Sequence, residues 1–409
     1  MFLVGVRSVW ALLLGVALLS LGNGLQGTLL GVRASTEQFG TAVTGLIMSG
    51  YSVGLLIGSF ITPRLISHVG HIRVFAAFAS IASTAVLLFP VFVEPIWWFA
   101  VRILIGFCLS GLFIVAESWL NAVSSNKDRG QILSVYMVIS YACLGLGQIL
   151  LNVSSPSGFV LFLLVSGLVS TAMVPMTLVQ VTTPTVTEAR SISIAELYRR
   201  SPLAVICAFA NGLGQSAFFY MGAVYGTISG LTVAQVSMLM ALPPLGVILS
   251  QFPIGYVSDR TDRRKVLTVL AFVASALAIA CYPASLTGAH DILIILFGLF
   301  GAIALPLYSL AIAHANDNLD ADQILGASGK LLLIYGAGAI LGPLLVGQAM
   351  SLMGASGFPA YLVIVYAGMG AFAIYRMSRR APPLTKRDFV IVGPVLPVKP
   401  GSLEATAEE

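Results

Sequence analysis

Long apolar runs separated by short charged segments constrain the fold of this chain more than any other feature. Residues 255–265 hold six charges in eleven positions, and apolar runs of about 20 residues flank them on both sides. A run of that length matches the hydrocarbon core of a bilayer, whereas such a density of charge has to stay in water. We therefore predict a tight turn at a membrane surface between two spanning helices.

The composition supports this placement. Of the 409 residues, 58% are apolar and 9% are charged, so an all-α polytopic membrane protein is predicted. The net charge of +5 is small and the basic residues are scattered through loops, which argues against a nucleic-acid partner. The four cysteines lie in apolar runs without metal-ligand spacing, so we expect neither a metal nor a cofactor.

An internal repeat divides the chain into two related halves. Residues 131–133 and 323–325 share the sequence Gln-Ile-Leu, and residues 63–73 are a weaker copy of 255–265 at the same offset. Glycines also pair at this offset, which is 192 residues: Gly22 with Gly214, Gly54 with Gly246, and Gly106 with Gly298. One offset shared by separate segments indicates duplication.

Twelve transmembrane helices in two parallel six-helix bundles are predicted. The expected spans are 8–30, 41–63, 74–93, 96–120, 131–151, 159–180, 202–225, 234–257, 266–286, 292–314, 324–350 and 359–375. The predicted domains are an N-terminal bundle (1–181), a cytoplasmic linker (182–201) with a short surface helix at 194–200, a C-terminal bundle (202–376) and a disordered cytoplasmic tail (377–409).

The distribution of basic residues predicts the orientation. If the amino terminus is cytoplasmic, Arg33 is the only basic residue in the outer loops, and the basic residues of all other loops and both termini lie inside. This bias predicts cytoplasmic termini in a bacterial inner membrane. Because each half has an even number of spans, the two halves run parallel.

Two motifs carry a family resemblance. Residues 255–264 follow the pattern G-x-x-x-D-R-x-x-R-R, and in span four Arg102 precedes Gly106 and Gly111. With the duplicated six-span plan, they resemble the major facilitator superfamily of transporters. Further segments are similar to a bacterial YcaD-like subgroup: 115–118, 129–130, 136–138, 146–148, 251–255 and 341–343.

The resemblance implies alternating access, with a gating role for the charged turn. That role is carried to Gly255, Asp259, Arg260, Arg263 and Arg264. The first copy of the motif departs from the family pattern, since a serine at 67 and a histidine at 68 replace its Asp and Arg. The Gly-Pro element of drug antiporters is also missing from span five, which argues against that activity.

Three charges fall within the predicted spans: Arg102, Glu117 and Lys330. Each costs about 2.5–3.5 kcal/mol at mid-membrane and should face a cavity or a partner. Glu117 and Lys330 have similar depths, and the resemblance implies that spans four and five close against spans ten and eleven. We hypothesise an ion pair between them that holds the inner gate. Alternatively, Lys330 extends to the headgroups and Glu117 caps loop groups.

Arg102 has three interpretations: an anchor for an anionic substrate, a proton-coupling group, or a hydrogen-bonding partner of span one. If transport is proton-coupled, Glu117 is the leading carrier and Asp259 a peripheral alternative. Other polar and aromatic candidates for the cavity are Asn23, Gln26, Asn211, Gln215, Tyr141 and Tyr335. Hydrogen bonding between helices explains any one of the amides equally well.

Glycines recur every four residues in two spans. Gly50, Gly54 and Gly58 form such a face in span two, and Gly338 and Gly342 in span eleven. The resemblance implies that these spans meet across the interface between the halves, so the faces are predicted to slide there.

A secondary transporter of a small organic solute is the function that these patterns favour. Residues 326–331 lack the spacing and hydroxyl of a nucleotide-binding loop, so ATP drive is not expected. An enzyme activity is not expected either, because His314 and Asp317 near an inner loop are too few for a cluster of catalytic groups at one depth. We favour proton-coupled efflux of an amphiphilic compound by a monomer in the lipid bilayer. The alternatives are uptake of a polar metabolite, a non-transporting sensor on the same fold and an intramembrane enzyme.

Overall fold

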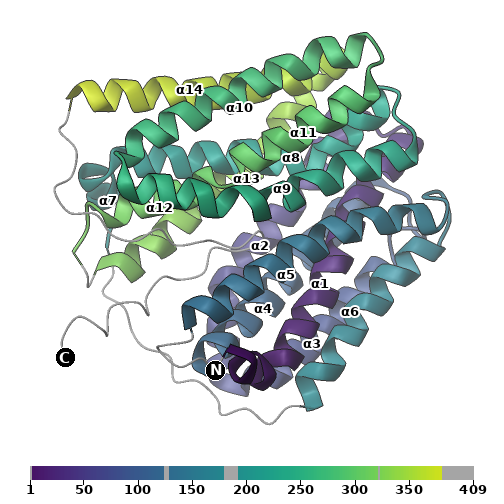
Figure 1. Ribbon diagram of the computed structural model, residues 1–409. Coiled ribbons are helices and arrows are strands. Elements are labelled where there is room, and N and C mark those ends of the chain that lie inside the picture. Colours follow the sequence, from purple (N-terminus) through teal and green to yellow (C-terminus); the bar gives the residue numbers. More distant parts are fainter. Residues whose placement is uncertain (1, 124–128, 179–191, 321–322, 380–409) are drawn as a thin grey trace.

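The computed structural model describes residues 2–123, 129–178, 192–320 and 323–379, and these residues form helices and connecting turns without any strand (Figure 1). The first half contains α1 (Phe2–Thr36), α2 (Thr41–Val69), α3 (His71–Val86), α4 (Pro95–Val123), α5 (Arg129–Ile149), η1 (Leu150–Val153) and α6 (Val160–Leu178). The remainder contains α7 (Ile194–Arg200), α8 (Pro202–Ile228), α9 (Val233–Arg260), α10 (Arg263–Leu286), α11 (His290–Ala304), α12 (Leu307–Asn316), α13 (Ile324–Met353), η3 (Gly354–Ser356) and α14 (Gly357–Arg379).

The predicted twelve spans are present. Within the described ranges, ten stretches are long and apolar enough to cross a membrane, and one of them, Gly326–Arg379, contains both α13 and α14. The shorter apolar helix α3 completes the twelve. Helix α7 occupies the residues expected for the surface helix. Residues 380–409 of the predicted tail, 182–191 of the predicted linker and 179–181 at the end of the predicted N-terminal bundle lie outside the described residues.

One span differs from its prediction. The expected continuous helix over 292–314 is divided into α11 and α12, which are separated by Leu305 and Pro306. Proline has no backbone N–H and its ring interferes with the preceding turn, so the helix breaks in the middle of the span. The apolar run is continuous through this point, and hydrophobicity alone therefore did not reveal the break.

The helices form two bundles that repeat the same pairings (Figure 1). In the first bundle α1 packs on α5 and α6, and α2 on α4; in the second α8 packs on α13 and α14, and α9 on α11. The repeat glycines lie at matching crossings. A side chain at Gly54 would overlap the backbone of Ile103 in α4, and one at Gly246 would lie 2.9 Å from Ala302 Cβ in α11. The duplication seen in the sequence is thus a duplication of helix packing.

Local sequence signals set the starts of three helices in the second half. Thr232 and Gln235 form a capping box that starts α9, and Pro202 occupies the first turn of α8, where its missing N–H needs no partner. Asp262 starts α10, because its side chain accepts a hydrogen bond from the Arg264 backbone N–H at 3.0 Å.

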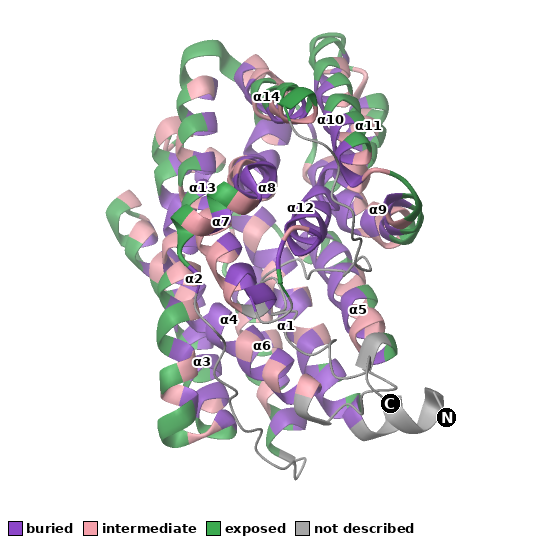
Figure 2. Ribbon diagram, turned by 90° about the vertical axis from the view of Figure 1, so that its left-hand side faces the viewer, coloured by how far each residue is buried: buried purple, intermediate pink, exposed green. Residues whose placement is uncertain are grey.

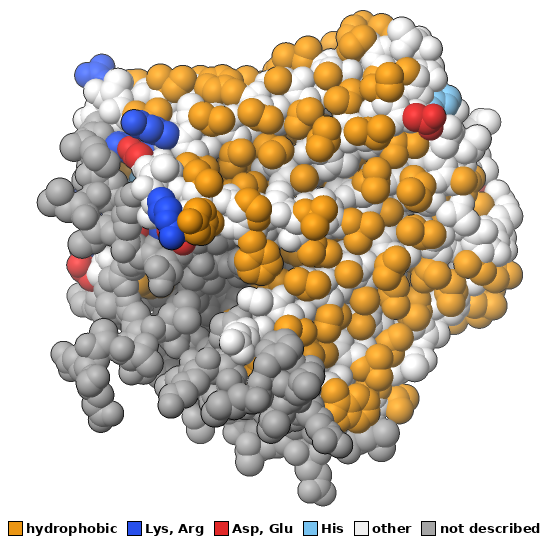
Figure 3. Space-filling model, viewed as in Figure 1, with side chains coloured by type: hydrophobic (Ala, Val, Ile, Leu, Met, Phe, Trp, Pro, Cys, Tyr) orange, Lys and Arg blue, Asp and Glu red, His pale blue; other side chains and the backbone are white. Residues whose placement is uncertain are grey.

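The outer surface has the polarity that a bilayer requires. On the face that Figure 3 shows, hydrophobic side chains cover the middle of the molecule, and the visible charged side chains of the described residues lie toward its two ends. Exposed apolar residues lie on outward helix faces, while the buried residues line the interior (Figure 2). Leu249, Leu352 and Ile364 are among the most exposed of these residues. Such a belt is stable in lipid and would aggregate in water.

The two ends of the molecule differ in charge. The α2–α3 and α9–α10 turns, α7 and the last turn of α14 lie at one end, which we call the basic end. The residues of these segments include Arg64, Arg73, Arg200 and Arg260. At the opposite far end, Arg33 is paired with Glu37 at 2.6 Å. That the basic end faces the cytoplasm stays a prediction.

Candidate substrate-binding site

A cavity lies between the two bundles, midway along the helices. It is lined from the first half by α1, α2, α4 and α5 and from the second half by α8 and α13. Its polar lining includes Asn23, Tyr51, Arg102, Gln215, Tyr220 and Tyr335. The volume is about 60 Å³, which is room for a few water molecules.

Arg102 is the charged group of this cavity. Its side chain is 1% exposed, and its guanidinium carbon lies 4.5 Å from the ring centre of Tyr51 and 5.3 Å from that of Tyr220. Gly106 makes this possible: a side chain there would overlap the Tyr51 backbone, so the glycine lets α4 approach α2 one turn beyond Arg102. Among the described residues, no carboxylate pairs with Arg102, and its Nε and Nη2 atoms have no hydrogen-bond partner.

Three amides of the lining are held by hydroxyl groups. Tyr51 donates to Asn23 Oδ1 at 3.0 Å, and Tyr335 donates to Gln215 Oε1 at 3.1 Å. The third amide, Gln148, accepts from the hydroxyl of Thr28. In each case the amide oxygen accepts a hydrogen bond from a hydroxyl group.

The predicted cavity residues divide into two groups. Asn23, Arg102, Gln215 and Tyr335 line the cavity, whereas Gln26, Asn211 and Tyr141 do not. Position 26 is rotated by about 60° from position 23 on α1, and Asn211 donates to the Cys207 carbonyl of its own helix at 2.8 Å. Tyr141 packs between the halves against Val247 and Leu305.

Ser52, Gln148 and Ser216 line the cavity without having been singled out by the sequence. Ser216 is rotated by about 100° from Gln215 on α8, so its spacing from Gln215 did not point to it. Gln148 lies in the Leu-Gly-Gln segment that carries the subgroup resemblance.

The break between α11 and α12 connects directly to the cavity. Pro306 cannot donate to the Ala302 carbonyl, and Ser250 of α9 donates to that oxygen instead, at 2.6 Å. The Leu305 carbonyl accepts from Gln215 Nε2 at 3.1 Å. Gln215 therefore lines the cavity and stabilises the broken span. Proline within an apolar run was the sequence signal for this feature.

Glu117 and Lys330 are not paired in this conformation. Glu117 is buried and accepts a hydrogen bond from Tyr136 of its own bundle at 2.7 Å. Lys330 is half-buried on α13, and the part of the chain that the structure describes contains no ion pair between the two. The hypothesised pair belongs to a conformation closed at the basic end, so it stays a prediction.

Contacts between the halves include several at the far end. Thr41 of α2 donates to the Gly347 carbonyl of α13 at 3.0 Å, and Asn152 after α5 donates to Ser237 of α9 at 2.7 Å. Gly45 also lies directly against the Pro343 backbone. The two bundles are therefore closed against each other at this end.

The glycine faces do not lie where they were predicted. Gly50, Gly54 and Gly58 face α4, and Gly338 and Gly342 face α8, so both faces are buried within their own halves. Spans two and eleven do meet across the interface, as α2 and α13. Their close approach is at Gly45 and Gly347 instead. The prediction that the five glycines form the sliding interface is wrong. A spacing of four residues places glycines on one face of a helix, but it does not say which neighbouring helix that face contacts.

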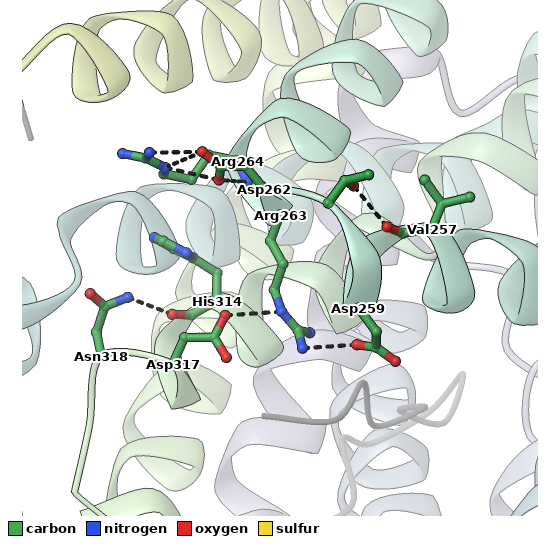
Figure 4. Close-up of polar contacts among 9 residues, drawn as sticks. Val257, Asp259, Asp262, Arg263, Arg264, His314, Asp317 and Asn318 are labelled. Carbon is green, nitrogen blue, oxygen red and sulfur yellow. Dashed lines mark hydrogen bonds and ion pairs between the residues drawn. The ribbon is translucent and has the colours of Figure 1, made fainter. Parts of the chain in front are cut away.

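The charged turn forms a buried network at the basic end (Figure 4). Arg263 is 2% exposed; its Nη2 lies 2.8 Å from Asp259 Oδ1 and its Nε 2.9 Å from Asp317 Oδ2, after α12. Arg260 lies over the Tyr256 ring at 3.5 Å. The candidate gate residues are thus gathered together, with Gly255 buried one turn earlier in α9. Arg263 joins the α9–α10 turn to the end of the broken span.

Asp262 and Arg264 form a second pair in the same turn. Arg264 Nη2 lies 2.8 Å from Asp262 Oδ2. Partial burial acts to raise the pKa of Asp262, but the hydrogen bonds from the Arg264 side chain and backbone, together with its charge, hold that pKa below its ordinary value. Asp262 therefore stays ionised at neutral pH.

In the first half, His71 occupies the position that the repeat assigns to Arg263. Its Nε2 lies 3.1 Å from Ser118 Oγ, and its ring stacks on Trp119. At equivalent places, the second half therefore has ion pairs of an arginine and the first half has a histidine in contact with a serine and a tryptophan. Among the described residues, no group of three His, Cys, Asp or Glu side chains could hold a metal ion.

Comparisons with known proteins agree with this architecture. A family model described as the Major Facilitator Superfamily matches residues 12–232 and 204–397. An uncharacterised MFS-type transporter of Yersinia pestis (strain Pestoides F) is 27% identical over 388 residues, covering 94% of this chain and 99% of the relative. The uncharacterised MFS-type transporter YcaD of Escherichia coli O6:K15:H31 is 29% identical over 350 residues, covering 84% and 89%.

Solved structures share the fold. The crystal structure of the nucleoside transporter NupG matches with a TM-score of 0.72 at 14% identity, covering 91% of this chain and 98% of that one. A bacterial homologue of the human lysosomal transporter Spinster, inward-facing and unoccupied, matches with a TM-score of 0.67 at 13% identity, covering 91% and 95%. With its duplicated bundles, central cavity and charged turn, this chain belongs to the major facilitator superfamily.

Proposed function

We propose that the protein is a secondary active transporter that moves a small organic solute by alternating access. The observation that carries the proposal is the cavity between two related bundles, lined by polar groups from both. A site at the junction of two repeats can open to either side as the repeats rock against each other. The lining combines tyrosine rings with amides, so we continue to favour efflux of an amphiphilic compound over uptake of a polar metabolite.

The contacts at the far end support a stage of the transport cycle in which the two halves are closed at that end. Hydrogen bonds from Thr41 and Asn152 close that end, and the cavity of about 60 Å³ is too small for a drug-sized ligand. A solute would therefore enter or leave as the halves separate at the basic end. In that movement Arg263 and its partners would travel with the second half as one unit.

Glu117 is our candidate for proton coupling. Among the described residues, it is the one carboxylate that lies more than a turn inside a spanning helix. A buried carboxylate can carry a proton across the barrier and release it when its surroundings open. Its partner Tyr136 is neutral, so protonation of Glu117 leaves no unpaired cation in the bundle.

Flux measurements in proteoliposomes test the proposal. Radiolabelled organic acids, amines, sugars and nucleosides would be supplied with and without an imposed pH gradient, and we expect one class to accumulate only with the gradient. A sensor would bind a solute without moving it, and an enzyme would return a changed compound; either result contradicts the proposal.

The variant Glu117→Gln separates coupling from transport. It should abolish accumulation driven by the gradient and retain exchange of labelled for unlabelled solute. The matched control is Glu94→Gln, which alters an exposed carboxylate at the far end. Gradient-driven accumulation by Glu117→Gln would show that the coupling group lies elsewhere.

A further inference from the structure

The unpaired edge of Arg102 identifies the chemistry of the ligand. The Nε–H and the adjacent Nη2–H point in the same direction and form one of the two edges on which a guanidinium binds a carboxylate with two parallel hydrogen bonds. These are the two Arg102 nitrogens that have no partner among the described residues. We propose that the cavity binds a small organic anion whose carboxylate docks on this edge of Arg102.

The charge balance of the cavity supports an anion. The residues that line it include Arg102 and no Asp or Glu, and Glu117 is about 22 Å away along α4. The guanidinium carbon lies over the rings of Tyr51 and Tyr220, and this cation–π attraction partly offsets the desolvation of the guanidinium but leaves its Nε–Nη2 edge unpaired. A buried cation without a counter-ion is unfavourable, so a ligand that brings the negative charge gains the largest interaction in the site.

The neutral lining is also arranged to donate hydrogen bonds. The amide oxygens of Asn23 and Gln148 are occupied by the hydroxyls of Tyr51 and Thr28. Each of these amides then has its NH₂ group left to offer, and an NH₂ group only donates. A lining that offers these NH₂ groups beside the Arg102 edge favours a ligand rich in acceptors, which again describes an anion better than an amine.

The rest of the lining limits the body of the ligand. Leu55, Leu144 and Phe219 supply apolar surface beside the polar groups, so a carboxylate attached to a small apolar body matches both parts in polarity. A body larger than a few water molecules enters as the halves separate at the basic end. Tyr51 belongs to the first bundle and Tyr220 to the second, and both contact Arg102. An anion on Arg102 therefore binds where the two halves meet, and its occupancy would bear on their movement.

The test measures binding by the purified full-length protein in detergent. The probes are propionate, benzoate and 4-hydroxybenzoate, each paired with its uncharged primary amide, and sodium chloride at equal ionic strength. At least one acid should raise the midpoint of thermal unfolding, while its amide and chloride leave it unchanged. Equal shifts by an acid and its amide, equal shifts by chloride, or no shift by any of the three acids would overturn the proposal.

Variants at Arg102 assign the effect to the proposed edge. Arg102→Lys keeps the charge but lacks the two parallel donors, so the Kd of the responding acid should rise about ten- to hundredfold. Arg102→Gln should abolish the shift, and Arg64→Gln, at an exposed position of the basic end, should not change it. If Arg102→Gln does not fold, the Arg102→Lys result decides; an unchanged Kd in that variant contradicts the proposal.

This inference rests on the proposed transport function, and the two can fail separately. Counterflow of the responding acid in proteoliposomes distinguishes them. Binding that depends on Arg102 without counterflow would contradict the proposed transport function and support the anion site. Counterflow of neutral solutes, without any acid that shifts the unfolding midpoint, would support the transport function and contradict the anion site.

Discussion

At the scale of single residues, burial decides what an ion pair contributes. Asp317 and Asp320 are three positions apart after α12, and each contacts an arginine at 2.9 Å. The Asp317 side chain is 1% exposed and contacts Arg263, which is 2% exposed, whereas the Asp320 side chain is 69% exposed. The Coulomb energy of the second pair is screened by water, and that of the first is not.

Asp317→Asn should therefore destabilise the protein strongly. Removing one partner leaves the buried Arg263 charge incompletely compensated, which lowers the free energy of unfolding by about 3–5 kcal/mol. The measurement is the midpoint of thermal unfolding in detergent. The matched control Asp320→Asn removes an exposed pair, for which about 0–1 kcal/mol is expected. Equal losses in the two variants would contradict the stabilising role of the buried network.

At the scale of helices, glycines hold each bundle together. Gly54 and Gly106 lie where α2 crosses α4, and a side chain at either position would overlap backbone of the other helix. Backbone atoms cannot move aside as a flexible side chain can, so the two helices would have to separate. These glycines therefore serve folding of the first half more directly than motion between the halves.

Gly54→Ala should lower stability before it affects transport. Overpacking of this kind lowers the free energy of unfolding by about 1–3 kcal/mol. The measurement is gel filtration of detergent-solubilised protein after heating, in which lower stability reduces the monodisperse peak. The control Gly167→Ala places its methyl group in open space on α6, and its stability should be unchanged. A stable but inactive Gly54→Ala protein would restore the sliding interpretation.

The broken span offers a second prediction at this scale. Ser250 donates to the Ala302 carbonyl because Pro306 has no N–H to offer. Ser250→Ala should lower the free energy of unfolding by about 0.5–2 kcal/mol. In a Pro306→Ala background the loss should be smaller, since the new N–H at position 306 can reach the same carbonyl. A double-mutant cycle of unfolding midpoints measures this, and strictly additive effects would exclude the substitution of one donor for another.

At the scale of the whole molecule, the two bundles are closed at the far end. Thr41 and Asn152 form hydrogen bonds across that interface, while Glu117 at the other end contacts Tyr136 in its own half. A cycle of alternating access needs a second set of contacts that forms when the first is broken. Glu117 and Lys330 have the opposite charges and similar depths that such a contact requires.

Charge exchange tests this gate. Glu117→Lys and Lys330→Glu should each reduce solute flux in proteoliposomes, and the double variant should recover part of it, because attraction between the two positions is restored. As a control, Glu196→Gln on α7, at a partly exposed position 3.5 Å from Arg200, should leave flux unchanged. No recovery in the Glu117 and Lys330 double variant would exclude the pair.

The sequence alone determined the class and plan of the protein: the membrane spans, their duplication and the charged turn at Asp259. These features follow from local rules, because hydrocarbon excludes charge and repeated sequence repeats its packing. A charge or an amide is unfavourable in lipid, and this also made Arg102 and Gln215 candidates for the cavity.

Only the tertiary structure decided which neighbours those residues have. It placed Gly54 against α4 and not α13, left the Arg102 edge without a partner, and joined Gln215 to the broken span at Leu305. Each of these depends on the rotation of one helix against another, and the sequence constrains that rotation weakly. In a membrane both the lipid and the protein interior are apolar, so hydrophobicity does not say which face of a helix packs against which neighbour.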